Sequence, residues 1–322
     1  MPVMTDRIDN LFQRPLDMAD NVHLASHASA SENEVHTNDA FSEKWVTLDQ
    51  DPGDDAEGWK RAQFDWYLRC YGFVDEGALV DFLKDKTVLL DAGCGPGYKA
   101  AWLARLAPHA TVVAMDLSDS IFVAGQRYTD VPNLVFVKGD IAKTPFRNGV
   151  FDLVSCDQVL HHTDDPPATV REFARINKPG GILNTYVYSK KALPRELLDE
   201  HFRVYSKSLS REEIWALSDQ LTQLGRTLSE LNVRIEVPAM PALGINGGEM
   251  DLQRFIYWNF IKCFWNADFG FDDSRMVNFD WYAPSTAYRY SAEEFEAMVD
   301  QAGFTADFLH SEEACHTGRF HK

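Results

Sequence analysis

Thr87-Val-Leu-Leu-Asp-Ala-Gly-Cys-Gly-Pro-Gly-Tyr98 is the stretch of sequence that decides the fold. Residues 87–90 are β-branched or apolar at every position, which is typical of a short strand covered on both faces. Gly93, Gly95 and Gly97 then allow the backbone to turn tightly and to approach a ligand closely. A glycine triplet by itself is more often a tight turn than a ligand site, so the flanking residues have to decide between the two.

Two classes of nucleotide cofactor bind at a loop of this kind. A dinucleotide site has the pattern Gly-x-Gly-x-x-Gly, with the pyrophosphate on a helix N-terminus. Here Tyr98 stands at the third glycine position, and Asp91 ends the strand directly before the loop. A carboxylate at this place repels a pyrophosphate but attracts a ligand whose near end carries an ammonium group and a sulfonium. These residues predict S-adenosylmethionine as the cofactor and argue against a nicotinamide dinucleotide.

Acidic side chains also follow the next predicted strands. Residues 111–116 end in Asp116, which lies about twenty residues past the loop, the spacing at which a carboxylate binds ribose hydroxyls. The alternative for Asp116 is a solvated acid in a turn. After the strand at residues 134–138, we expect Asp140 to accept a hydrogen bond from the adenine amino group and Ile141 to pack on the ring. Leu117 and Cys94 complete this part of the predicted cofactor site, Cys94 through its small size rather than its reactivity.

Two further strands are predicted at residues 151–157 and 181–188. Asp157 and Gln158 end the first of them and could bind either the amino group of the cofactor or the acceptor. Because the strands alternate with helical stretches, the sequence predicts an α/β fold with a doubly wound parallel sheet. Ligands of such sheets lie at the carboxyl ends of the strands.

The order and spacing of these segments resemble the motifs of class I S-adenosylmethionine-dependent methyltransferases. The segments that carry the resemblance are residues 90–97, 115–118, 139–141, 151–154, 159–163 and 178–181. Residues 41–45, 279–284 and 298–304 look similar to a bacterial small-molecule subgroup of that family, whose substrates also include glycan and secondary-metabolite precursors. The resemblance implies a Rossmann-like sheet of seven strands, methyl transfer by in-line displacement and S-adenosyl-L-homocysteine as the product.

The chain divides into five predicted segments. We expect a polar, acidic and partly flexible arm at residues 1–55, helices that cover the cofactor at 56–84 and the cofactor-binding core at 85–188. Residues 189–287 are expected to form a mainly helical, aromatic-rich insertion that acts as a substrate lid, and residues 288–322 a last helix with two strands. Residues 253–265 are apolar nearly all round, so we expect a helix buried in the insertion or in a homodimer interface. Ser291 and Glu294 predict a capping box at the start of the last helix.

Candidate acceptor-site residues follow the fourth strand and end the insertion. A hydroxyl or ammonium acceptor needs a base, and His161 or His162 could supply it. The alternative is that this pair only shapes its loop. Tyr282, Tyr288, Arg289 and Tyr290 are candidates for contact with the acceptor. No metal is predicted, since adjacent histidines point in different directions and Asp164–Asp165 is better placed to cap the next helix.

Charge and composition restrict the partners. A formal net charge of -18 over 322 residues disfavours a nucleic-acid substrate, since such binding depends on Lys and Arg. Without a run of eighteen apolar residues or a signal segment, we expect a cytoplasmic protein that does not bind membranes, and the scattered cysteines predict no disulfide framework. A small-molecule acceptor methylated on O or N rather than C is the leading hypothesis. The alternatives are a protein side chain as acceptor, transfer of another group from the cofactor, or a non-catalytic cofactor-binding scaffold.

Overall fold

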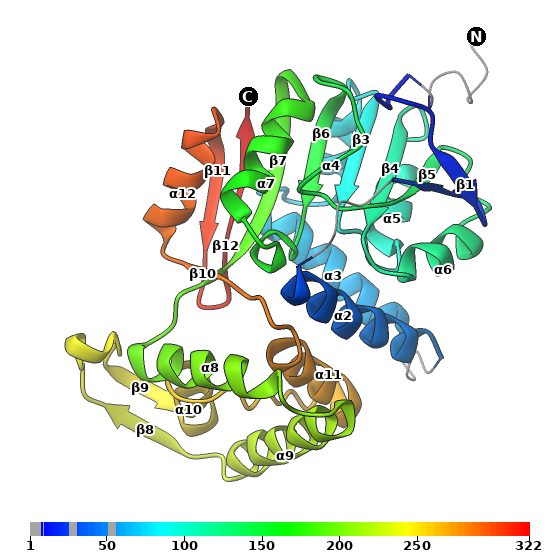
Figure 1. The fold of residues 1–322 in the computed structure, drawn as a ribbon. Coiled ribbons are helices and arrows are strands. Elements are labelled where there is room, and N and C mark those ends of the chain that lie inside the picture. Colours follow the sequence, from blue (N-terminus) through cyan, green and yellow to red (C-terminus); the bar gives the residue numbers. More distant parts are fainter. Residues whose placement is uncertain (1–7, 9, 26–30, 51–55) are drawn as a thin grey trace. The chain divides into compact units, whose positions relative to one another are not determined.

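The computed structural model describes residue 8 and residues 10–25, 31–50 and 56–322. The chain forms two compact units, which Figure 1 shows as ribbons. The first unit contains Met1–Ser189 and Tyr288–Lys322, and the second contains Lys190–Ala287. The second unit is therefore an insertion in the sequence of the first.

A largely parallel sheet forms the centre of the first unit. Seven of its strands follow the order β5-β4-β3-β6-β7-β12-β11. In chain order these are β3 (Val88–Ala92), β4 (Thr111–Asp116), β5 (Leu134–Lys138), β6 (Phe151–Cys156), β7 (Asn177–Ser189), β11 (Thr305–Ser311) and β12 (Cys315–His321). β12 is antiparallel to both β7 and β11, whereas the pairs from β5 to β7 are parallel. This confirms the predicted α/β sheet with its core of seven strands.

Both faces of the sheet are buried, as expected for strands without a polar side. Leu89 and Val112 belong to one apolar core, and their neighbours Leu90 and Val113 belong to the other. The first core includes side chains of α3 (Ala56–Cys70), α4 (Glu76–Leu83), α5 (Tyr98–Leu106) and α6 (Ser120–Arg127). The second core includes side chains of α7 (Pro166–Ile176) and α12 (Ala292–Gln301). The glycine loop lies between β3 and α5, at the carboxyl end of the sheet.

Two helix starts follow the predicted capping chemistry. Asp165 caps α7, since its Oδ1 accepts a hydrogen bond from the Ala168 N–H at 2.9 Å. At α12, the Ser291 Oγ accepts from the Glu294 N–H at 3.2 Å, and the Glu294 carboxylate accepts from the Ser291 N–H at 2.8 Å. The capping box and the role of Asp165 are thus confirmed.

Regular structure in the N-terminal arm was not predicted. The described part of residues 1–55 contains β1 (Asp17–Ala19), β2 (Val22–Leu24) and α2 (Glu32–Gln50). β2 pairs in parallel with β5, with Val22 opposite Phe136, and β1 pairs with β2. With the short β10 as well, the described residues contribute ten strands to the sheet. These additions are stabilised by long-range packing, which a three-residue strand cannot reveal in its own sequence.

The second unit is mainly helical. It contains α8 (Leu193–Ser206), α9 (Arg211–Glu230), α10 (Leu252–Asn259) and α11 (Gly270–Tyr282), together with a hairpin of β8 (Arg234–Val237) and β9 (Gly248–Asp251). The expectation of one helix over residues 253–265 is wrong, because α10 ends at Asn259. Beyond that point the backbone is irregular, and its polar groups are bound by the side chains of Gln253, Tyr282 and Asn278. Among the described residues, no helix is long and apolar enough to span a membrane.

The insertion leaves and re-enters the first unit at neighbouring points. β7 ends at Ser189, and the chain returns as β10 (Arg289–Tyr290). β10 pairs in parallel with the end of β7, with Arg289 opposite Tyr188 and Tyr290 opposite Ser189.

Candidate functional site

The glycine loop has a backbone that other residues could not adopt without strain. Gly93, Gly95 and Gly97 have φ angles of 82°, 52° and 79°. A Cβ on Gly93 would also lie 2.5 Å from a methyl of Val159. The loop is held to β4 because the N–H groups of Gly93 and Cys94 donate to the Met115 carbonyl at 2.8 and 3.1 Å. Cys94 is buried, which raises the pKa of its thiol well above the usual range and leaves it unreactive.

Asp116 holds the loop from the end of β4. One of its carboxylate oxygens accepts a hydrogen bond from the Gly95 N–H at 2.7 Å. The other accepts from the N–H and the hydroxyl of Ser118 at 2.8 and 2.6 Å. Burial raises the pKa of Asp116, and these hydrogen bonds partly oppose that increase. These contacts fix the carboxylate between the glycine loop and Ser118, with Leu117 next to it in the sequence, and its binding of the ribose stays a prediction.

Asp91 and Asp157 bring two more carboxylates to the same place. Both are buried, with 4% and 8% of their surface exposed. The Oδ2 atom of Asp91 is buried and has no hydrogen-bond partner among the residues that the structure describes. Burial raises the pKa of Asp91 to about 7, and the carboxylates of Asp157 and Asp116 add to the effect while Lys99 opposes it. Asp91 is therefore poised to ionise when a cation approaches.

Lys99 and Tyr71 are the site residues that sequence reasoning missed. The ammonium of Lys99, in the first turn of α5, forms a buried ion pair with one oxygen of Asp157. The hydroxyl of Tyr71 donates to the other oxygen at 2.8 Å. Burial by itself lowers the pKa of Lys99, but Asp157, Tyr98 and Asp91 together outweigh it, and the net shift is upward. The sequence does contain a signal for Lys99: three strands end in acidic residues around one loop, and a cluster of buried carboxylates needs a cation nearby.

Gln158 follows Asp157 in a conformation that is rare for a residue with a side chain. Its φ angle is 65°, in the left-handed region. Its side-chain amide donates to Asp157 at 3.2 Å and to Gln63 of α3 at 3.3 Å. Backbone strain of this kind is concentrated at functional sites.

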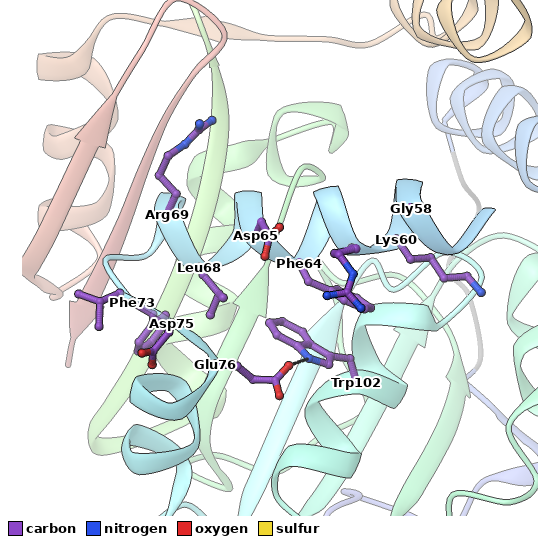
Figure 2. A pocket seen from close by; sticks show the side chains of 12 residues that line it. Gly58, Lys60, Phe64, Asp65, Leu68, Arg69, Phe73, Asp75, Glu76 and Trp102 are labelled. Atoms are coloured by element: carbon purple, nitrogen blue, oxygen red, sulfur yellow. Dashed lines mark hydrogen bonds between the residues drawn. The ribbon is translucent and has the colours of Figure 1, made fainter. Parts of the chain in front are cut away.

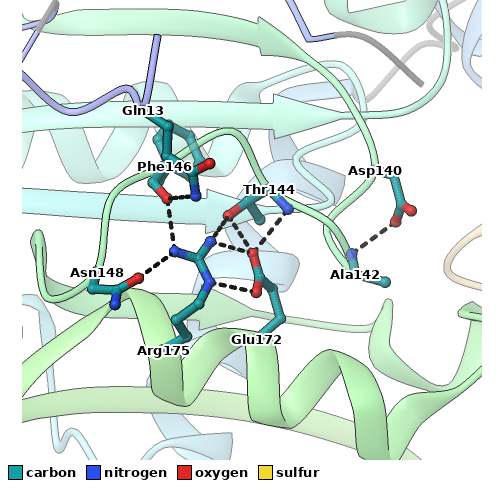
Figure 3. Close-up of polar contacts among 8 residues, drawn as sticks. All are labelled: Gln13, Asp140, Ala142, Thr144, Phe146, Asn148, Glu172 and Arg175. Carbon is teal, nitrogen blue, oxygen red and sulfur yellow. Dashed lines mark hydrogen bonds and ion pairs between the residues drawn. The ribbon is translucent and has the colours of Figure 1, made fainter. Parts of the chain in front are cut away.

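The loop after β5 carries Asp140, which Figure 3 shows, and Ile141. Asp140 accepts a hydrogen bond from the Ala142 N–H at 2.7 Å, and Ile141 is buried. A few residues later, Glu172 of α7 accepts from the N–H and hydroxyl of Thr144 at 2.9 and 2.6 Å. Arg175 donates to both oxygens of Glu172 and to the Phe146 carbonyl, as Figure 3 shows. This ion pair anchors the loop to α7.

His161 and His162 lie in an aromatic cluster after β6. The ring of His161 is 3.8 Å from that of Tyr188 and 5.6 Å from that of Tyr186, between ring centres. His161 is fully buried, whereas His162 is half-buried and contacts the Phe41 ring edge to face at 4.8 Å. The two histidines therefore differ in accessibility.

The four predicted acceptor contacts do not lie in one compact unit. Tyr282 is buried inside the second unit, where its hydroxyl accepts from the Lys262 N–H at 3.1 Å. Tyr288, Arg289 and Tyr290 belong to the first unit. There the Tyr288 N–H donates to the His161 carbonyl at 2.8 Å, so it fixes the histidine loop.

A separate cleft of about 1080 Å³ lies on the first unit (Figure 2). It is lined by α3, the start of α4 and Trp102 of α5. The Trp102 indole donates to Glu76 at 2.9 Å and stacks on Phe64, with ring centres 4.5 Å apart. None of the predicted cofactor residues lines this cleft, so the chemistry of the glycine loop lies elsewhere.

Comparison with known proteins matches residues 90–185 to a family described as methyltransferase domain. A ubiquinone biosynthesis O-methyltransferase of Albidiferax ferrireducens is 36% identical over 97 residues, which are 29% of this chain and 38% of that protein. An uncharacterized methyltransferase of Schizosaccharomyces pombe is 29% identical over 143 residues, 39% of this chain and 51% of that protein. The chain thus spans about half or less of these relatives. A solved 1,6-didemethyltoxoflavin-N1-methyltransferase of Burkholderia thailandensis has 12% identity and a TM-score of 0.45, with 94% of each chain covered.

Proposed function

We propose, from the premise that residues 90–185 form a class I S-adenosylmethionine-dependent methyltransferase domain, that this protein methylates a small-molecule acceptor. The observation that supports the proposal best is the charge of the glycine-loop site. Asp91, Asp116 and Asp157 are grouped there with the ammonium of Lys99. A surplus of buried carboxylates is complementary to a ligand with an ammonium group and a sulfonium.

The residues of the site fit S-adenosylmethionine, the cofactor of this domain. The unpartnered Oδ2 of buried Asp91 gains a cationic partner when the methionine ammonium binds. Asp116 would bind the ribose hydroxyls, and Asp140 with Ile141 would hold the adenine. Asp157 and Gln158 remain available for the amino group or for the acceptor. When bound, the cofactor would supply an electrophilic methyl group, with the thioether of S-adenosylhomocysteine as the leaving group.

The chain has to position the acceptor, exclude water and take up its proton. Orientation and exclusion of water account for much of the rate enhancement in such displacements. For an O or N acceptor we assign the base to His162 rather than His161, because His161 is fully buried and packed against Tyr188. The half-buried imidazole of His162 is accessible to a proton donor.

The test uses the full chain with S-adenosylmethionine carrying a ¹³C-methyl group and a pool of small molecules. We expect a small-molecule product that gains one labelled methyl group, with an equal amount of S-adenosylhomocysteine. His162→Asn should lower kcat by about 10²-fold while leaving cofactor affinity unchanged. Exposed His201→Asn in α8 is the matched control and should leave both unchanged.

Other outcomes separate the alternatives. If the labelled methyl group is found on a protein side chain, the acceptor is a protein and not a small molecule. Tight cofactor binding without labelled product from any pool would support a non-catalytic scaffold. Wild-type kcat in His162→Asn would refute the assignment of the base but not the methyl transfer.

A further inference from the structure

A buried lysine lies in the second unit, outside the predicted cofactor site. Lys262 is 7% exposed, and its Nζ lies 4.4 Å from the centre of the Trp281 ring. Within the described part of the chain, this Nζ forms no hydrogen bond and no ion pair. A buried ammonium without an anionic partner costs free energy, which is why lysine is almost never fully buried unless it is paired.

The segment that carries Lys262 is held in place by buried polar side chains. The Tyr282 hydroxyl accepts from the Lys262 N–H at 3.1 Å, and Asn278 accepts from the Phe264 N–H at 2.8 Å. The Gln253 amide donates to the Cys263 carbonyl at 2.9 Å. These contacts fix an irregular backbone between α10 and α11, so the position of Lys262 is set by the fold.

A second buried cation lies close to Lys262. The guanidinium of Arg195 in α8 is 5.1 Å from the centre of the same Trp281 ring. Arg195 is 1% exposed and donates from Nε to Asp199 at 2.7 Å and from Nη1 to the Tyr257 carbonyl. Asp199 therefore balances Arg195, whereas Lys262 forms no ion pair with any residue that the structure describes.

We propose that Lys262 and Arg195 form a binding site for a small oxyanion, a carboxylate or phosphate group of a ligand, inside the insertion. Both cations lie near one indole ring, and of the two only Arg195 forms an ion pair within the described residues, so Lys262 is the cation left to pair with a negative charge of the ligand. The Lys262 ammonium and the remaining guanidinium N–H groups provide charge-assisted donors for its oxygens.

The charges around Lys262 support this assignment and make the binding depend on pH. Burial lowers the pKa of Lys262 to about 7, and the positive charges of Arg195 and Lys191 add to this effect. The carboxylates of Asp280 and Asp199 oppose it. An anion prefers the protonated lysine, so binding takes up a proton and weakens as the pH rises through 7. Between pH 6 and pH 8 the protonated fraction falls from about 0.9 to about 0.1, a ten-fold loss of affinity.

The experiment is calorimetry on the full chain with acetate and, separately, inorganic phosphate at pH 6 and pH 8. We expect saturable binding of at least one anion at pH 6, and the preferred probe identifies the oxyanion class. Lys262→Met should weaken the binding at least ten-fold, and Lys262→Arg should restore part of it. Lys207→Met, at an exposed lysine beyond α8, is the matched control and should bind like the wild type.

A second measurement covers the case in which Lys262→Met does not fold. In wild-type protein with ¹³C-labelled lysine, the anion should raise the pKa of Lys262 by at least one unit, followed by NMR at the Cε. An unchanged pKa, equal affinity of Lys262→Met and wild type, or no saturable binding of either anion would overturn the proposal. The assay measures anion binding alone, so its failure leaves the proposed methyl transfer intact.

Discussion

The first prediction concerns the ionisation of Asp91 when the cofactor binds. The buried Asp91 carboxyl has a pKa of about 7, and its Oδ2 lacks a partner among the described residues. Below pH 7 the group is mostly neutral and cannot pair with an ammonium. Above pH 7 the carboxyl is mostly ionised and can pair with an ammonium, so affinity for the cofactor should increase as the pH rises through 7.

The size of the effect follows from the ionised fraction. That fraction is about 0.09 at pH 6 and about 0.91 at pH 8, so the dissociation constant should fall about ten-fold between them, equivalent to about 1.4 kcal/mol. Binding at pH 6 should also release about 0.9 proton, since Asp91 is ionised in the complex. Calorimetry with S-adenosylhomocysteine in buffers of different ionisation enthalpy measures both quantities.

Asp91→Asn is the variant that isolates the group. It keeps the size of the side chain but has no charge, so its affinity should be weaker at pH 8 and independent of pH. A wild-type affinity that stays constant from pH 6 to pH 8 would refute the reasoning. So would an Asn variant that keeps the ten-fold dependence, because another group would then be titrating.

Three further predictions test other parts of the structure. Asp116→Ala should weaken binding of S-adenosylhomocysteine about 10- to 100-fold in calorimetry, because it removes charge-assisted hydrogen bonds worth about 1.5–3 kcal/mol. Arg175→Ala should lower the free energy of unfolding by about 2 kcal/mol in urea titration, since Glu172 is left partly buried without its partner. Gly225→Ala should lower the melting temperature, because the new Cβ would lie 2.3 Å from the Cys263 carbonyl oxygen, and this overlap exceeds the gain of about 1 kcal/mol in helix propensity.

Each of these has a matched control on the surface of the same element or next to it. Asp119→Ala, Arg171→Ala and Thr227→Ala change exposed side chains and should stay close to wild type. Wild-type affinity in Asp116→Ala would remove the ribose assignment. Equal stability of the Arg175 and Arg171 variants would mean that the ion pair contributes nothing, and a more stable Gly225→Ala would show that the backbone can move aside.

The central sheet could be predicted because its signals are local. The apolar runs of β3 and β4 reflect burial on two faces, and Asp165 and Ser291 mark helix starts by hydrogen bonds to residues three positions on. β2 could not be predicted, because three residues pair with β5 more than a hundred positions later. The end of α10 depends on Tyr282 and Asn278, whose contacts span 20 and 14 residues and so lie outside the window in which helix periodicity is read.

The candidate site divides in the same way. Acids at strand ends, such as Asp91 and Asp116, are recognisable because parallel strands end at one edge of the sheet. Lys99 was missed because a lysine in the first turn of a helix is usually solvated. Its burial depends on Asp157 and on Tyr71, which come from other elements.

The pairing of β10 with the end of β7 places the two ends of the insertion on adjacent strands. Because the two strands are parallel, the chain must reverse its direction twice between Ser189 and Arg289, which takes a crossover of about a dozen residues or more. We therefore expect that a shorter crossover of that length could replace residues 190–287 without a change in the register of β10 against β7. Such a junction lets the sheet keep its register while the inserted segment varies in length and sequence.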